Sequence, residues 1–177
     1  MGIAKPVRTL LSGTFLAALM CTASVAFADE TVLPAAGDNI ETYWSAKYWT
    51  VFKNSSRQSC FIEWRSENSV VQAGLTAKKD AGYLGAFLKD VEPQAGEGGI
   101  TILLNDKLYV GSVTTVSRTL SGGFSGGYIV FDNPNFISDL EEAREFVAFQ
   151  DAPYKVTVKL KTPRNAIDRA RDCMAVF

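Results

Sequence analysis

The stretch SCFIEWR, residues 59–65, decides the fold class, because its side chains alternate between two sides of the chain. This two-residue period is that of a β-strand, and it places three residues together on one side: Cys60, Ile62 and Trp64. The preceding run YWTVFK, residues 48–53, is rich in β-forming residues, and residues 54–56 after it have the composition of a turn. The two runs therefore predict a β-hairpin.

Similar short runs continue along the chain, with Gly-, Pro-, Asn- or Asp-rich segments between them. They predict further strands at residues 70–76, 83–89, 100–104, 108–113, 128–131 and 154–160. Parallel strands need crossovers of a dozen or more residues, which this spacing does not provide. We therefore expect antiparallel pairing.

Two segments have a helical pattern instead. Ser138 and Glu141 fit a capping box, which predicts a helix from Ser138 to about Gln150 that buries Leu140, Ala143 and Val147. Thr162-Pro163 predicts the start of a second helix. The apolar face of that helix contains Ala166, Ile167, Ala170, Cys173 and Met174.

The first 28 residues have the pattern of a cleavable secretory signal. Lys5 and Arg8 form a basic start, residues 10–21 are apolar, and Ala26-Phe27-Ala28 is a small-x-small cleavage site. A membrane anchor is the alternative, but the apolar run is shorter than the roughly 20 residues that a span requires. We therefore expect a periplasmic or secreted protein of a Gram-negative envelope, with no stable membrane span after cleavage.

Composition and charge exclude several classes of protein. The 177 residues are 47% hydrophobic and 21% charged, which is typical of one packed domain. Removing residues 1–28 leaves 149 residues and takes away two of the 18 basic side chains and none of the 19 acidic ones, so the net charge becomes −3. A mildly acidic chain lacks the basic surface that binds nucleic acid.

The cysteine count predicts one disulfide. Cleavage would remove Cys21 and leave Cys60 and Cys173 in an oxidising compartment, where a bridge is the simplest outcome. The alternative is a redox pair, but such pairs usually form a Cys-x-x-Cys motif at a helix start. Because Cys173 lies on the apolar face of the second expected helix, it could reach a strand residue such as Cys60.

Catalytic motifs are incomplete. The chain has no histidine, which excludes histidine-based triads and nearly all catalytic zinc sites. GFSGG at residues 123–127 matches the nucleophile elbow around Ser125, but an elbow needs a helix after it and a histidine. We interpret residues 121–127 as an exposed, mobile Gly-Ser hairpin loop, with a binding loop as the alternative. No catalytic residue, metal site or cofactor is assigned.

Aromatic residues occupy both sides of the predicted hairpin. They either pack in the core or leave one set exposed as a contact surface for an envelope protein or a glycan. The candidate surface residues, including two beside the Gly-Ser loop, are Trp44, Trp49, Phe52, Trp64, Phe124 and Tyr128.

The expected signal, the WTVF strand at residues 49–52, Ser59-Cys60 and the closing Ala-Ile-x-x-Ala-x-x-Cys at residues 166–173 together resemble a known family. The chain is similar in layout to the invasion-associated locus B family and its uncharacterised periplasmic relatives. The resemblance implies an envelope β-rich domain with a Cys–Cys bridge and no known catalytic centre. The Gly-Ser loop and the helix at Ser138 depart from that family, so no functional residue is carried over.

These observations predict an α+β domain, built on an antiparallel β-sheet or β-sandwich with two packed helices and one disulfide. We expect a signal peptide at residues 1–28, a flexible lead at 29–41 and a single β-rich domain at 42–177. The expected function is non-catalytic binding or envelope support. The alternative is a histidine-free hydrolase that uses Ser125 or the paired carboxylates Glu141 and Glu142.

Overall fold

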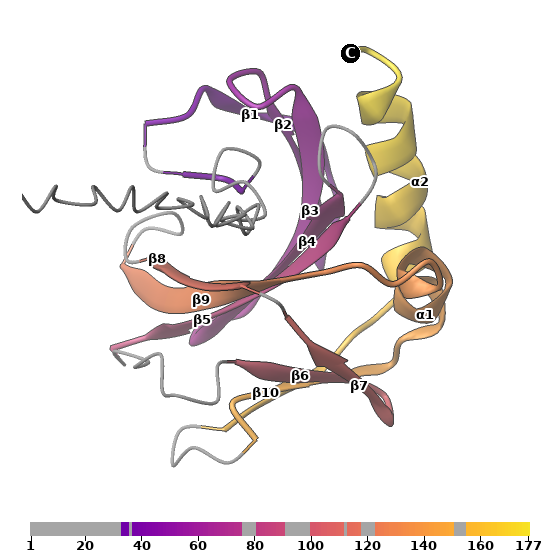
Figure 1. Cartoon of the computed structure of the whole chain (residues 1–177). Helices are drawn as coiled ribbons and strands as arrows, with labels where there is room; N and C mark the ends of the chain where they lie inside the picture. Colours follow the sequence, from indigo (N-terminus) through magenta and orange to yellow (C-terminus); the bar gives the residue numbers. More distant parts are fainter. Residues whose placement is uncertain are drawn as a thin grey trace, which may run out of the picture.

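The computed structural model describes residues 33–35, 37–75, 81–90, 100–111, 113–117, 123–150 and 155–177. The expected signal peptide lies outside these residues. The described chain forms two antiparallel sheets and two helices, which confirms the predicted α+β class (Figure 1).

The larger sheet has seven strands in the order β1-β2-β3-β4-β5-β9-β8, and each neighbouring pair is antiparallel. In that order the strands are β1 (Ile40–Ser45), β2 (Trp49–Asn54), β3 (Ser59–Arg65), β4 (Ser69–Leu75), β5 (Gly82–Lys89), β9 (Phe124–Phe131) and β8 (Val113–Ser117). The predicted hairpin is formed by β2 and β3, with Trp49 opposite Trp64.

The smaller sheet has four strands in the order β11-β10-β6-β7, also antiparallel. These strands are β11 (Val156–Lys159), β10 (Glu145–Ala148), β6 (Thr101–Leu104) and β7 (Lys107–Val110). The helices are α1 (Phe136–Glu142) and α2 (Pro163–Met174). Figure 1 shows the large sheet strongly curved, with α2 along its outer side and the smaller sheet at the opposite end from β1. The long helix α2 lies against β2, β3 and α1.

Each face of the large sheet is buried in its own core. The face toward the helices and the smaller sheet buries Cys60 and Ile62 of β3, together with Leu84 and Ile129. The other face buries Phe61, with a second group of side chains that includes Tyr83, Phe87 and Tyr128. The alternation in SCFIEWR therefore separates two buried faces and not a buried face from a solvated one.

The expected helix over residues 138–150 is wrong in both position and length. Helix α1 follows Asn135 at its N-cap, and it ends because Ala143 is extended. Ser138 lies inside α1, where its hydroxyl donates to the Asn135 carbonyl. The chain then enters β10, which pairs with both β6 and β11. These ladders satisfy the backbone and bury Phe146 and Ala148, which outweighs the helical spacing of the apolar residues.

The predicted strand over residues 108–113 is split between the two sheets at Gly111. Strand β7 ends at Val110, and β8 begins at Val113. A Cβ atom at Gly111 would lie 2.6 Å from the Cβ of Ile129 on β9. The missing side chain therefore lets the chain pass close to β9 as it leaves one sheet for the other.

The expected Gly-Ser hairpin loop is also corrected. Strand β9 already begins at Phe124, and Ser125, Gly126 and Gly127 pair with β5. A Cβ at Gly126 would lie 1.8 Å from the Ala86 carbonyl oxygen, so this glycine permits close approach of β5 and β9. Residues 121 and 122 lie outside the described part of the chain.

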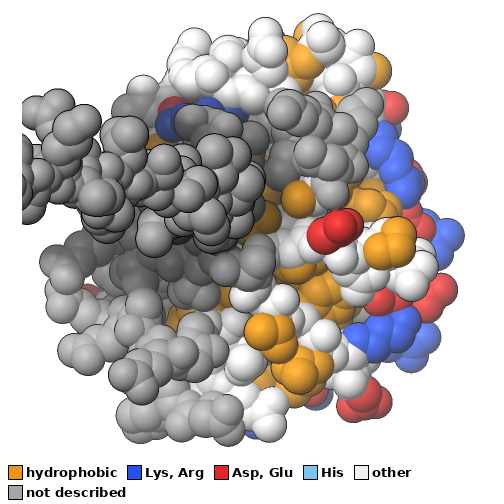
Figure 2. All heavy atoms as spheres, viewed as in Figure 1, with side chains coloured by type: hydrophobic (Ala, Val, Ile, Leu, Met, Phe, Trp, Pro, Cys, Tyr) orange, Lys and Arg blue, Asp and Glu red, His pale blue; other side chains and the backbone are white. Residues whose placement is uncertain are grey.

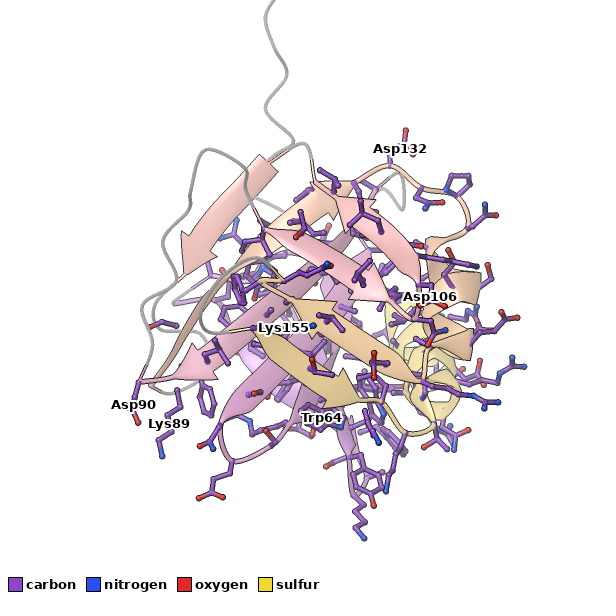
Figure 3. The ribbon with its side chains drawn as sticks, turned by 90° about the horizontal axis from the view of Figure 1, so that it is seen from below. Trp64, Lys89, Asp90, Asp106, Asp132 and Lys155 are labelled. Atoms are coloured by element: carbon purple, nitrogen blue, oxygen red, sulfur yellow. A yellow bond between two sulfur atoms is a disulfide. The ribbon has the colours of Figure 1, made fainter. Side chains whose placement is uncertain are left out.

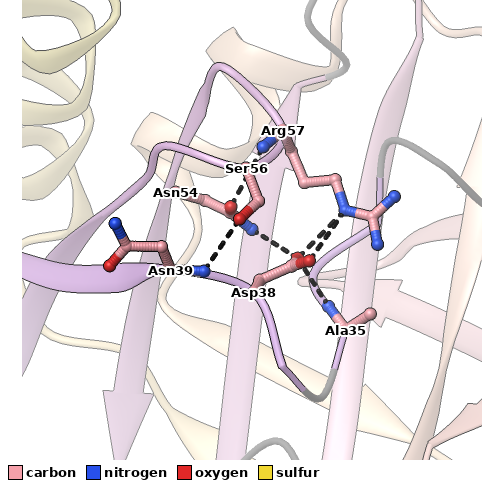
Figure 4. A network of polar contacts seen from close by, with 6 residues as sticks. All are labelled: Ala35, Asp38, Asn39, Asn54, Ser56 and Arg57. Atoms are coloured by element: carbon pink, nitrogen blue, oxygen red, sulfur yellow. Dashed lines mark hydrogen bonds and ion pairs between the residues drawn. The ribbon is translucent and has the colours of Figure 1, made fainter.

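The described part of the expected flexible lead is held by contacts. Leu33 is buried in the second core, and β1 begins at Ile40. The Asp38 carboxylate accepts hydrogen bonds from the Arg57 guanidinium, the Asn54 amide and the Ala35 N–H (Figure 4). These bonds attach the segment to the turn between β2 and β3.

Candidate functional site

The six aromatic residues predicted as a contact surface do not form one. Phe124 and Tyr128 are buried in the core that β9 shares with β5, and Trp49 is buried on the helix side. The indole Nε1 of Trp49 donates to the Lys161 carbonyl at 2.6 Å. Trp44 and Trp64 are half-buried on the helix side, and Phe52 is half-buried on the opposite face. The large sheet therefore divides the set between its two faces.

The groups of the hydrolase alternative lie on separate elements. Ser125 is half-buried on β9, and no hydrogen bond joins it to a lysine or carboxylate within the described residues. The Glu141 carboxylate on α1 forms ion pairs with Arg171 at 2.6 Å and Arg164 at 3.8 Å. Its neighbour Glu142 is exposed. These contacts hold α1 to α2 and leave no paired carboxylates beside Ser125.

The predicted disulfide is present and lies at the junction of β3 and α2. Cys60 and Cys173 are bonded, with their Cα atoms 6.1 Å apart. Both residues are buried, and the N–H of Cys60 also contacts the Met174 sulfur at 3.1 Å. Helix α2 is therefore attached to the large sheet near its C-terminal end.

An apolar cavity of about 340 Å³ opens next to this bridge. Its walls come from three places in the fold: the β3–β4 strands, α1 and α2. They are formed largely by Ile62, Ala73, Phe136, Leu140, Ile167 and Ala170. Figure 2 shows hydrophobic side chains at the surface between the strands and α2, bordered by charged side chains on the helical side. We call this space the helix–sheet cavity.

Small residues explain why the helix–sheet cavity is open. Ala73 on β4 and Ala170 on α2 face it from opposite walls, and neither side chain is long enough to fill the space. Leu140 and Phe136 of α1 close one end and are themselves buried in the main core. The walls are thus parts of well-packed elements, and the cavity does not depend on a surface loop for its shape.

The charge at the rim of the cavity is neutralised. Arg171 is the charged residue of the lining, and its guanidinium donates to Glu141 at 2.6 Å and to Asp168 at 2.9 Å. Because the Glu141 and Asp168 carboxylates balance the charge of the guanidinium, the rim offers little positive charge to a ligand. The arrangement suits an uncharged apolar group better than a carboxylate or phosphate.

A buried polar chain crosses the other face of the large sheet. Gln72 on β4 donates to the Glu63 carboxylate at 2.6 Å and accepts from the Tyr128 hydroxyl, while Arg65 donates to Glu63 at 2.8 Å. Burial raises the pKa of Tyr128 and of its neighbour Tyr83 well above the ordinary value. Both phenols are therefore neutral at physiological pH. This network of hydrogen bonds fits a structural role.

A second polar cluster joins α1 to β7. Asp139 accepts from the Tyr109 hydroxyl at 2.7 Å and from the Lys107 ammonium. Burial opposes ionisation of Asp139, but these two bonds outweigh it and hold the pKa of the carboxyl below its ordinary value. Burial and the bond to Asp139 raise the pKa of Tyr109. The cluster positions the hairpin of β6 and β7 against α1.

Sequence reasoning found one wall of the helix–sheet cavity and missed the cavity itself. The apolar face of α2 was predicted, and Ala166, Ile167 and Cys173 are buried as expected. The signal for open space is the small Ala170 between the larger Ile167 and Met174 of that face, opposite Ala73. Whether a small residue at this position leaves a cavity depends on the strand that faces α2. The periodicity of the sequence does not determine that strand.

Among the described residues, no group of three or more His, Cys, Asp or Glu side chains is placed to hold a metal ion. No helix in the described ranges has the length and apolar character needed to cross a membrane. No protein-family model, curated protein or solved structure matches the chain.

Proposed function

We propose that this chain is an exported, non-catalytic binding domain of the bacterial envelope that holds an uncharged apolar group in the helix–sheet cavity. The observation that carries the proposal is an apolar cavity of about 340 Å³ between α1, α2 and the β3–β4 strands. Ligand pockets of globular proteins commonly measure roughly 300–1,000 Å³ and are lined mostly by apolar side chains.

The size of the cavity favours a small group over a folded partner. An apolar cavity of about 150 Å³ already holds a benzene molecule in a model protein. The helix–sheet cavity is larger and so has room for a branched aliphatic or bicyclic aromatic group. Binding of such a group would be driven by the removal of its apolar surface from water.

The disulfide supports the binding role because it fixes two walls of the cavity before a ligand arrives. Cys60 lines the cavity itself, and Cys173 lies on the helix that provides Ile167 and Ala170. A site with fixed walls loses little conformational entropy on binding. Reduction of the bridge is therefore expected to weaken ligand binding as well as to lower stability.

Export is supported by the signal pattern of residues 1–28 and by the pairing of the two remaining cysteines. Disulfides persist in oxidising compartments such as the periplasm. The resemblance to the invasion-associated locus B family points to the same compartment. We therefore place the protein in the periplasm or outside the cell, with a signal peptide removed after Ala28.

The proposal is tested by titrating the protein with N-phenyl-1-naphthylamine, an uncharged apolar dye whose fluorescence rises in apolar surroundings. We expect saturable binding that Ala170→Leu weakens, because the added side chain occupies the cavity from the α2 wall. Asn165→Leu is the matched control, since this exposed position on α2 does not line the cavity. Equal dye binding by Ala170→Leu and the unchanged protein would contradict the proposal.

The rim chemistry gives a second arm of the test. Dodecanol and dodecanoate have the same alkyl chain and differ in charge. Competition against the bound dye should be at least as strong for dodecanol, because Arg171 is already paired with Glu141 and Asp168. A clear preference for dodecanoate would show that the cavity recognises an anionic head group and not an uncharged ligand.

A further inference from the structure

The free edge of β7 differs from the other sheet edges whose side chains are described. Strand β7 ends the smaller sheet and pairs with β6 on one side only. Its Leu108 and Val110 side chains are 59% and 57% exposed, although both are large and apolar. Figure 2 shows hydrophobic side chains at the surface in the region of β6 and β7.

The hairpin register determines which backbone groups face outward from β7. Asn105 and Asp106 form a two-residue turn, with Asn105 at a φ of 52°, so Leu104 and Lys107 form the closing hydrogen-bonded pair. Hydrogen bonding to β6 then alternates along the strand. The N–H and C=O groups of Leu108 and Val110 therefore point to the free edge, and no other described residue bonds to them.

Other edges carry features that discourage strand pairing, and β7 lacks them. Strand β1 has an irregular register between Thr42 and Trp44. The edge strand β11 exposes Lys159, with Lys155 just before it. Bulges and lysines of this kind protect edges against pairing with other chains. The single charged side chain of β7, Lys107, is bound to Asp139 instead.

A groove of about 380 Å³ lies beside β7, lined by Leu108 and Val110 on one side and, on the other, by Phe131 at the end of β9 and Pro134 after it. The same groove includes Asp132, which is exposed and projects from the molecule (Figure 3). Neither Asp132 nor the exposed Asp106 at the hairpin tip has an ion-pair partner within the described residues.

We propose that β7 is a docking edge for an extended, apolar and basic peptide segment of a partner protein. The segment would add a strand to β7, with backbone bonds to Leu108 and Val110 and apolar side chains against them, as in other cases of strand addition. Its basic residues would lie near Asp106 and Asp132. A second copy of this chain suits the edge less well, because it would bring the same two carboxylates to the shared groove.

The test uses ¹⁵N-labelled protein and a short synthetic peptide of alternating valine and threonine with lysine at both ends. We expect the peptide to shift the amide signals of Leu108 and Val110 in a saturable way. A peptide with glutamate at both ends should bind about fivefold weaker, and added salt should reduce the difference. A peptide N-methylated on every valine and threonine keeps the side chains but loses its backbone donors, and it should not shift these signals.

A variant pair locates the binding on the protein. Leu108→Lys together with Val110→Lys should abolish the shifts, because both side chains are exposed and lysine protects an edge. Thr157→Lys is the control, since it places lysine at an exposed position on the opposite edge strand, β11. Absence of saturable shifts, or equal binding of the N-methylated peptide, would overturn the proposal. Concentration-dependent dimers that the double variant abolishes would assign the edge to a second copy and also overturn it.

Discussion

Cys60 of β3 and Cys173 of α2 form a disulfide between residues 113 positions apart, with their Cα atoms separated by 6.1 Å. A bridge over this sequence distance restricts the unfolded chain strongly. The chain-entropy model gives roughly 4–5 kcal/mol for a loop of this size, an upper figure that residual structure reduces. We expect the double variant Cys60→Ala, Cys173→Ala to unfold at a clearly lower urea concentration than the unchanged protein.

The control for this prediction is the unchanged protein with a reducing agent, which should match the double variant. Thiol titration of the unfolded, unreduced protein lacking residues 1–28 should find no free thiol. Two reactive thiols, or equal urea midpoints with and without reductant, would show that the bridge does not form in solution.

The Asp38 cluster predicts a pH-dependent contribution to stability. Burial opposes ionisation of Asp38, but the bonds from Arg57, Asn54 and Ala35 outweigh it and hold its pKa below the ordinary value. The contribution is therefore present above the unfolded pKa of about 3.9 and is lost as the pH falls through the lower folded pKa. We expect Asp38→Asn to lower the free energy of unfolding by about 2 kcal/mol at pH 7, with a smaller difference below about pH 4.

Urea unfolding at several pH values measures this difference. Asp172→Asn is the matched control, because that carboxylate on α2 is exposed and forms a surface ion pair with Arg169. Its effect should stay within about 0.5 kcal/mol. A difference for Asp38→Asn that is the same at pH 3 and pH 7 would exclude its ionisation as the cause.

The Tyr109–Asp139 bond gives a prediction on the other side of the pH scale. The buried hydroxyl donates to Asp139 at 2.7 Å, and burial together with this bond raises the pKa of Tyr109. Stability is therefore full below the unfolded pKa of about 10 and declines as the pH rises above it. We expect Tyr109→Phe to cost about 1–2 kcal/mol at pH 7, because Asp139 then loses a buried donor.

Thermal unfolding measures the cost, and Tyr43→Phe is the control because Tyr43 is exposed on β1. Ultraviolet titration of the unchanged protein should also show Tyr48, whose pKa is lowered by Lys47 and Lys161, ionising before Tyr83, Tyr109 and Tyr128, whose pKa values are raised. Ionisation of all tyrosines together near pH 10 in the folded protein would contradict the burial of the hydroxyl groups.

Local patterns in the sequence predicted elements whose pairing is also local. The β2–β3 hairpin and the apolar face of α2 are confirmed, and so is the disulfide, because the cysteine count and the helical period agreed on it. Strand β10 was missed, since its residues 145–148 also fit a helical period. Its partners, β6 and β11, lie elsewhere in the chain, and only their ladders decide between the two structures.

The candidate site was less predictable than the fold for the same reason. The helix–sheet cavity combines residues of β3, β4, α1 and α2, and the open space depends on their relative placement. The docking edge depends on sheet order, which leaves β7 at an end. The predicted aromatic contact surface was wrong because the large sheet is covered on both faces. Phe124 and Tyr128 are therefore buried in a second core.

In the GFSGG segment, Gly126 has a packing role, whereas Ser125 is the residue that a catalytic role would require. Gly126 lies on β9, where a Cβ would be 1.8 Å from the Ala86 carbonyl oxygen and 2.6 Å from the Cα of Phe87. Both atoms are backbone of β5, so a side chain can be accommodated only if the two strands move apart. We expect Gly126→Ala to lower the free energy of unfolding by about 3 kcal/mol, and Gly126→Val by more.

Ser125→Ala on the same strand is the matched variant, and it should change stability by less than about 0.5 kcal/mol. A nucleophilic serine needs a base within hydrogen-bond distance, about 3 Å, and no described lysine or carboxylate bonds to Ser125. Serine-directed covalent probes should therefore leave the protein unlabelled. Stoichiometric labelling that Ser125→Ala abolishes would refute the non-catalytic proposal and favour the hydrolase, whereas a mild effect of Gly126→Ala would refute only the close approach of β5 and β9.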